Sequence, residues 1–202
     1  MTTSVLDAPL SDIRDELETN LFGIIRVARA FAPVLANQPQ SSMVNVLSAL
    51  SWVSFGRGYE ISKSAAWSAT NALRLALRDQ GTTVTALHVG YMDTDMTARV
   101  EAPKADPRDI ARQTADAIIA GDYEILADDT TRTVKSQLSN DVTALYAQLA
   151  AASSHGEVVT ATREHKRAIR VGRAQSTSDW ASGEGVGCPD GTIATGRKEH
   201  RY

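Results

Sequence analysis

The 202-residue sequence has little of several features that mark specialised classes of protein. Its single cysteine, Cys188, cannot form a disulfide within the chain, which fits a reducing compartment. No apolar run approaches the ~20 residues of a membrane-spanning helix, and Met1–Ser4 lacks the basic residue and apolar run of a signal peptide. A net charge of −3 gives no reason to expect nucleic acid or an anionic membrane as partner. We therefore expect a soluble cytoplasmic protein without a metal site.

Helical and strand-like patterns alternate along the first 150 residues. Apolar residues recur at helical spacing from Asp12 to Leu35, and Ser11 stands where an N-cap would. The other expected elements are strands at Met43–Leu47, Thr83–Val89 and Tyr123–Leu126, and helices at Tyr59–Asp79, from Pro107 to Gly121, and at Thr131–Leu149. This order predicts an α/β fold with a parallel sheet and flanking helices.

The composition changes near Ala151. Residues 151–202 carry eight Lys/Arg against six Asp/Glu, hold seven of the thirteen glycines, and show no sustained hydrophobic period. We predict a folded domain over residues 1–150 and a largely disordered tail over residues 151–202. The basic stretch Arg163–Arg173 leaves a second interpretation of the tail open, as a contact arm.

The segment from Val44 to Lys63 holds the residues that indicate chemistry. Ser48 follows a predicted strand, at the end of the sheet where open α/β folds place their ligands. Tyr59 and Lys63 stand four apart at a helix start, so their side chains share one face. An ammonium beside a phenol stabilises the phenolate and lowers a pKa that is ordinarily about 10. Each feature alone is commonplace, but together they predict a proton relay that interconverts a carbonyl and an alcohol.

This arrangement, Asn45-Val46-Leu47-Ser48 followed by Tyr59-x-x-x-Lys63, resembles the active-site pattern of the short-chain dehydrogenase/reductase family, with a slightly shorter intervening loop. The resemblance implies a Rossmann-like fold and hydride transfer between a nicotinamide and a secondary alcohol or carbonyl compound. It implies that Tyr59 is the acid/base, that Lys63 lowers the pKa of its phenol, and that Ser48 orients the substrate. Both Tyr59 and Lys63 would also contact the cofactor.

Two further segments are similar to motifs of the same family. Glu18–Gly23 resembles the helix that carries a fourth catalytic residue, here Asn20, which holds a kinked helix backbone and positions a water. Val89–Thr94 is similar to a Pro-Gly-x-x-x-Thr segment, with valine in place of proline. The resemblance implies that Gly90, the backbone amide of Met92 and the hydroxyl of Thr94 bind the nicotinamide end of the cofactor.

The family's glycine-rich turn, which seats the pyrophosphate at a helix N-terminus, has no counterpart in this sequence. In family terms the amino-terminal βαβ units are missing, so NAD and NADP are equally compatible cofactors. One alternative is a catalytically silent fragment that acts as an oligomerisation or interaction module. Another is a gene model that starts too late and ends in a wrong frame. The helices around residues 12–35 and 59–79 match those that family members use to dimerise, which predicts a homo-oligomer.

Overall fold

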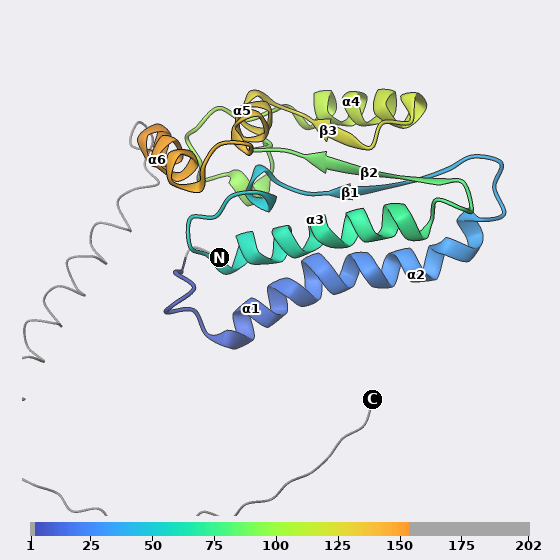
Figure 1. Ribbon diagram of the computed structural model, residues 1–202, viewed down its shortest axis with the longest axis horizontal. Helices are drawn as coiled ribbons and strands as arrows, with labels where there is room; N and C mark the ends of the chain where they lie inside the picture. Colours follow the sequence, from blue (N-terminus) through green and yellow to red (C-terminus); the bar gives the residue numbers. More distant parts are fainter. Residues whose placement is uncertain (1–2, 154–202) are drawn as a thin grey trace, which may run out of the picture. The chain divides into compact units, whose positions relative to one another are not determined.

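The computed structural model describes residues 3–153, which form a parallel sheet between helices (Figure 1). The strands β1 (Ser41–Val46), β2 (Thr82–His88) and β3 (Glu124–Leu126) lie in the order β1-β2-β3, and both pairings are parallel. The helices of four or more residues are α1 (Leu10–Leu17), the π-helix η1 (Glu18–Phe22), α2 (Gly23–Leu35), α3 (Gly58–Ala76), α4 (Pro107–Ala120), α5 (Asp129–Gln137) and α6 (Val142–Ser153). The predicted α/β fold with a parallel sheet and flanking helices is confirmed.

The helices cover both faces of the sheet. Figure 1 shows α1, α2 and α3 on one side of the strands, and α4 and α5 on the other. On the first side Leu47, Ala66 and Ala86 form a buried cluster. On the α4 side a larger cluster joins strand β2 to helix α4 through Leu87 and Ile110. Burial of these apolar side chains holds the helices against the sheet.

The bounds of the expected strands agree with the structure to within two residues. Most of the expected helices agree with it to within two residues at one of their two ends. Two local predictions were wrong. Ser11 is not an N-cap, because the helix begins at Leu10 after Pro9. Helix α3 ends at Ala76 and not at Asp79, and Gly81 lies in the turn that follows, with φ at +78°. The helix predicted from Pro107 to Gly121 is α4, and Gly121 follows it in the left-handed conformation typical of a helix C-terminus.

The predicted helix over Thr131–Leu149 is wrong, because the structure has two helices there, α5 and α6. The side chain of Asp141 accepts a hydrogen bond from the backbone N–H of Thr143 at 2.8 Å. This interaction satisfies an N–H at the start of α6 and lets a new helix begin. The predicted boundary near residue 150 stays a prediction, and nearly all of the predicted tail lies outside the described residues.

No helix between residues 3 and 153 combines the length and the apolar character that crossing a membrane requires.

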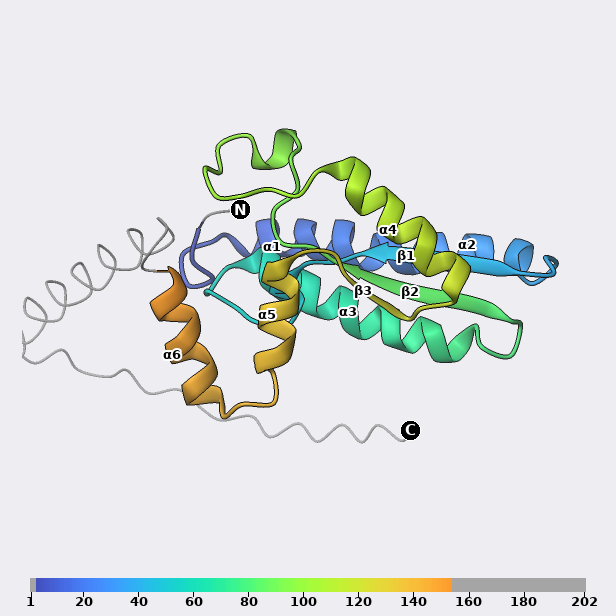
Figure 2. The same ribbon diagram turned by 90° about the horizontal axis from the view of Figure 1, so that it is seen from above.

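The carboxyl ends of the strands and the beginning of α3 lie at the same end of the sheet (Figures 1 and 2). Helices α5 and α6 lie at this end as well, in both views. Segments from residues 48, 59 and 90 are therefore brought together, since each follows a strand end or begins a helix there. This end of an open parallel sheet is where ligands usually bind.

Candidate active site

Ser48 ends the extended segment after β1 and caps the short 3-10 helix η2 (Ala49–Ser51). Its Oγ accepts a hydrogen bond from the backbone N–H of Leu50 at 3.1 Å. The side chain of Ser51 accepts in turn from the backbone N–H of Ser48 at 3.2 Å. This reciprocal cap fixes the orientation of a serine that is only 6% exposed. Because its Oγ accepts the capping bond, the hydroxyl hydrogen stays available to another acceptor.

Tyr59 and Lys63 lie on the first turns of α3, on one face of the helix as their spacing predicts. The ammonium of Lys63 lies 5.6 Å from the centre of the Tyr59 ring, within the range of a cation–π contact. It also donates a hydrogen bond to the backbone carbonyl of Val46, the last residue of β1, at 3.1 Å. The side chain of Ser48 is hydrogen-bonded to Tyr59 as well. The structure thus brings Ser48, Tyr59 and Lys63 together.

That Lys63 lowers the pKa of Tyr59 stays a prediction, and other groups act on this phenol as well. Burial raises the pKa of Tyr59 above its ordinary value; the hydrogen bond from Ser48 opposes the rise, and the charge of Glu16 adds to it. Burial also lowers the pKa of Lys63. At neutral pH the phenol of Tyr59 is therefore protonated.

Asn20 lies in the middle of η1, so the sequence motif that predicts a distorted helix coincides with a π-helical segment. Its side-chain amide donates to the hydroxyl of Ser62 at 2.9 Å. The same hydroxyl donates to the backbone carbonyl of Tyr59 at 2.8 Å. Since Ser62 is completely buried, this chain of bonds ties η1 firmly to the turn of α3 that carries Tyr59.

The segment after β2 holds Gly90, Met92 and Thr94 close to the sheet end. The backbone N–H of Gly90 donates to a carboxylate oxygen of Asp128 at 2.6 Å. A Cβ at Gly90 would lie 3.1 Å from that oxygen, so only glycine fits this approach without movement. Thr94 is exposed, and its hydroxyl donates a long hydrogen bond, 3.4 Å, to the carbonyl of Met92. The hydroxyl of Thr94 is thus accessible to a ligand.

Glu60, next to Tyr59, is a residue that the sequence analysis missed. It is 1% exposed, and one carboxylate oxygen accepts hydrogen bonds from Ser54 Oγ at 2.6 Å, Phe55 N at 2.7 Å and Arg57 N at 3.0 Å. Its other oxygen accepts from the guanidinium of Arg57 at 2.9 Å. Burial alone raises the pKa of Glu60, but these bonds and the Arg57 charge outweigh it and hold the pKa below its ordinary value. Glu60 thereby fixes the loop that leads into Tyr59.

Sequence signals existed for two of the missed residues. Glu60 stands at the third position of α3, where a glutamate completes a capping box with the residue before the helix. Asp128 is the N-cap of α5 and bonds to the backbone N–H of Thr131 at 2.8 Å. Buried His88 at the end of β2 offers no such signal. In the sequence, a strand histidine that contacts a site cannot be told from one that only packs in the core.

Apolar residues near the site divide between core and surface. Val53 is 3% exposed and packs in a cluster with Ala49 and Leu145. Trp52 stacks on the ring of His88. Met96, in contrast, is 86% exposed on the loop after β2. The first two therefore support the fold of this region.

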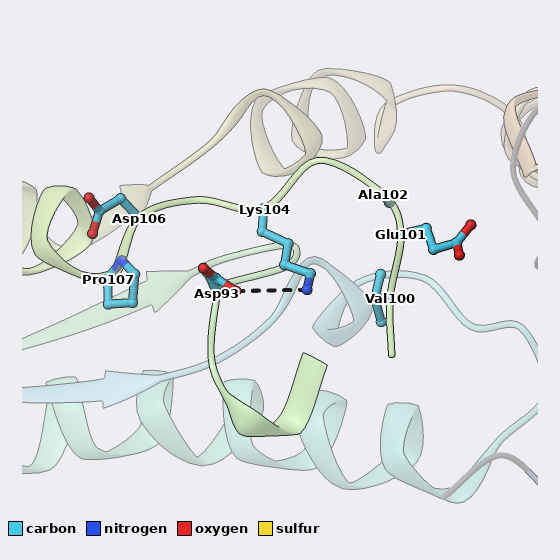
Figure 3. Close-up of a pocket in the computed structure, with 7 residues that line it drawn as sticks. All are labelled: Asp93, Val100, Glu101, Ala102, Lys104, Asp106 and Pro107. Atoms are coloured by element: carbon cyan, nitrogen blue, oxygen red, sulfur yellow. Dashed lines mark ion pairs between the residues drawn. The ribbon is translucent and has the colours of Figure 1, made fainter. Parts of the chain in front are cut away.

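A hollow of about 520 Å³ lies beside the Gly90–Thr94 segment (Figure 3). Its lining residues are Asp93, Val100, Glu101, Ala102, Lys104, Asp106 and Pro107. In Figure 3 the ammonium of Lys104 points toward the carboxylate of Asp93, and the ion pair measures 3.7 Å. Neither Ser48 nor Tyr59 lines this hollow, so we base the candidate site on the hydrogen-bonded residues.

Comparison with known proteins gives relatives of one kind. The chain is 28% identical over 138 residues to 1-deoxy-11-beta-hydroxypentalenate dehydrogenase of Streptomyces exfoliatus, which covers 67% of this chain and 46% of the relative. It is 30% identical over 96 residues to the NADPH-dependent 1-acyldihydroxyacetone phosphate reductase of Schizosaccharomyces pombe, covering 46% of this chain and 32% of that one. The chain spans half or less of the length of these curated relatives.

Solved structures agree with the sequence comparison. A short chain dehydrogenase from Burkholderia cenocepacia, in complex with NADP, superposes with a TM-score of 0.68 at 30% identity, covering 73% of this chain and 65% of that one. A short-chain dehydrogenase from Novosphingobium aromaticivorans shares the fold, with a TM-score of 0.57 at 17% identity over 88% of this chain and 62% of its own. The family model described as short chain dehydrogenase matches residues 1–105. The chain belongs to the short chain dehydrogenase family.

Proposed function

We propose that residues 1–150 form the catalytic half of an NAD(P)-dependent oxidoreductase acting on a small secondary alcohol or carbonyl compound. The observation that carries this proposal is the meeting of Ser48, Tyr59 and Lys63 at the carboxyl end of β1. Family membership and the NADP-bound relative support it. The nicotinamide, when bound, supplies or accepts the hydride.

The residues at the sheet end suit such a cofactor. Lys63 has three N–H donors, and its described hydrogen bond to Val46 leaves two for ribose hydroxyls. The hydroxyl of Thr94 and the backbone of Met92 lie on a partly exposed loop, where they would hold the nicotinamide carboxamide. Gly90, whose backbone N–H donates to Asp128, would set the position of that loop.

Tyr59 would hold and move the proton. Its raised pKa keeps the phenol protonated at neutral pH, the form that donates to a carbonyl oxygen as this becomes an alcohol. With substrate bound, Ser48 would donate its hydroxyl hydrogen to the substrate oxygen in place of Tyr59 and so orient that oxygen toward the phenol. Asn20 would keep the start of α3 in place through Ser62.

A hybrid protein tests this proposal. The 202-residue chain would be joined to the amino-terminal half of the Burkholderia cenocepacia relative, which binds NADP as a whole protein. NADPH and NADH oxidation would then be followed with a panel of ketones and aldehydes. We expect carbonyl-dependent turnover. A folded hybrid that binds NADPH and reduces no carbonyl compound would contradict the proposal.

We also propose that the chain forms a homo-oligomer through α2. Its exposed face carries apolar side chains at helical spacing, Val27, Phe31 and Val34, each 54–55% exposed. Such a continuous apolar stripe on a helix suits burial against a second copy.

Replacing Phe31 with glutamate should dissociate the oligomer, because a buried carboxylate without a partner opposes association. Light scattering coupled to size exclusion would measure the mass of each form. Ile119→Glu is the matched control, since Ile119 is equally apolar and 85% exposed but lies on α4. A monomeric parent chain, or dissociation by both variants alike, would contradict an interface on α2.

A further inference from the structure

His88 is the last residue of β2, and it is fully buried next to the backbone of Ser48. Its Nδ1 lies 3.1 Å from the backbone carbonyl oxygen of Ser48. Its ring stacks on that of Trp52, with centroids 3.8 Å apart and 21° between the planes. The imidazole is therefore held in place by both a polar and an aromatic contact.

The contact with Ser48 defines the tautomer of His88. A carbonyl oxygen only accepts hydrogen bonds, so Nδ1 must carry the hydrogen. Nε2 then carries a lone pair, and it has no hydrogen-bond partner among the described residues. Burial lowers the pKa of His88, which keeps the ring neutral at pH 7.

Charged groups from three neighbouring elements act on the ring. A carboxylate oxygen of Glu124, on β3, lies 3.6 Å from Nε2. The ammonium of Lys135, on α5, bonds that carboxylate at 2.8 Å and lies 4.8 Å from the Trp52 ring. Arg74, on α3, also influences the His88 pKa, in the downward direction. Since Lys135 pairs with Glu124, the carboxylate does not require a proton on Nε2.

The carbonyl of Ser48 accepts a second hydrogen bond, from the backbone N–H of Ser51 at 3.0 Å. Both bonds act on the peptide unit that follows the Ser48 side chain. With the cap between Ser48 Oγ and Leu50, they set where the hydroxyl points. Of these donors, only His88 comes from another part of the sequence, 40 residues away.

We propose that His88 is a positioning residue of the candidate active site, whose Nδ1–H fixes the Ser48 carbonyl and so aims the Ser48 hydroxyl at Tyr59. This inference rests on the proposed function, because it assigns His88 a role only where Ser48 and Tyr59 act together. It goes beyond the four residues that the sequence predicts, since His88 acts on the reacting groups through Ser48.

The test uses the titration of Tyr59 in the 202-residue chain, followed by NMR of 13C-labelled tyrosine. Tyr59→Phe assigns the signal among the five tyrosines. Ser48→Ala supplies the reference, because it removes the hydrogen bond that lowers the Tyr59 pKa. His88→Leu removes the Nδ1–H but fills the space, whereas the amide of His88→Asn can still donate to the Ser48 carbonyl.

We expect Ser48→Ala to shift the Tyr59 pKa upward, His88→Leu to shift it upward by a comparable amount, and His88→Asn to leave it near the parent value. A folded His88→Leu chain whose Tyr59 titrates as in the parent, while Ser48→Ala shifts it, overturns the role of His88 and leaves the proposed function standing. A Tyr59 titration that Ser48→Ala does not move overturns both.

A second measurement keeps the inference testable if His88→Leu does not fold. Two-bond 1H–15N correlation spectra of the parent chain report the tautomer of each of its four histidines, and His88→Asn assigns the signal. We expect a protonated Nδ1 and an unprotonated Nε2. A hydrogen on Nε2 alone would overturn the inference, because no bond could then reach the Ser48 carbonyl.

Discussion

Tyr59→Phe is expected to lower turnover of the hybrid enzyme by about 10²–10⁴-fold, the usual contribution of a general acid–base group. Phenylalanine keeps the ring and its packing on α3 and removes only the hydroxyl that faces Ser48. The loss should therefore fall on the chemical step, with NADPH binding largely kept. Initial rates of NADPH oxidation at saturating carbonyl substrate measure it.

Tyr123→Phe is the matched control for this experiment. Tyr123 is 59% exposed and contacts Arg74 through its ring, which phenylalanine retains. We expect its turnover to stay within about twofold of the parent. A loss below about tenfold for Tyr59→Phe, or equal losses for the two variants, would contradict the assignment of Tyr59.

Glu60→Gln is expected to destabilise the chain by about 2–4 kcal/mol at pH 7, because it breaks an ion pair between a fully buried carboxylate and the partly exposed guanidinium of Arg57. The amide can keep one oxygen toward Ser54 and the backbone, but its NH₂ group would then face the guanidinium of Arg57. Urea unfolding of both proteins measures the difference in free energy. Glu101→Gln is the control, since Glu101 is exposed in a loop, and its effect should stay within about 0.5 kcal/mol.

The pH dependence of this difference follows from the lowered pKa of Glu60. A carboxylate whose pKa is lower in the folded than in the unfolded state adds stability above its unfolded pKa, about 4.3. That stability is lost as the pH falls through the folded value. The gap between parent and Glu60→Gln should thus be constant from pH 7 to about pH 5 and shrink in more acidic solution. A gap that is independent of pH down to about pH 2 would contradict an ionised Glu60.

The sequence predicted the fold, and it predicted that Ser48, Tyr59 and Lys63 lie together, because the signals are local. Helical spacing places Tyr59 and Lys63 on one face, and a buried strand predicts that Ser48 lies at its carboxyl end. The sequence did not predict the break between α5 and α6. Helix-forming residues are frequent throughout Thr131–Leu149, so the pattern favours one continuous helix although Asp141 caps a second one. Local periodicity could not reveal a bond between one side chain and one N–H.

Contacts between distant segments account for what the sequence did not predict. His88 and Ser48 are 40 residues apart, and Asp128 reaches Gly90 across 38 residues. Their pairing depends on the register of β2 against its neighbours, which the amino-acid pattern does not specify. The raised Tyr59 pKa likewise depends on burial and on Glu16, which lies on α1 and not on α3.

The most direct test of a nicotinamide site in this chain is a titration with the two halves of the cofactor. The 15N-labelled 202-residue chain would be titrated separately with nicotinamide mononucleotide and with adenosine monophosphate, while backbone amide signals are followed by NMR. We predict that nicotinamide mononucleotide shifts the amides of Lys63, Met92 and Thr94, whereas adenosine monophosphate leaves them unchanged. No shift at these residues, or the same shifts with both nucleotides, would contradict the claim that this chain holds the catalytic end of the cofactor.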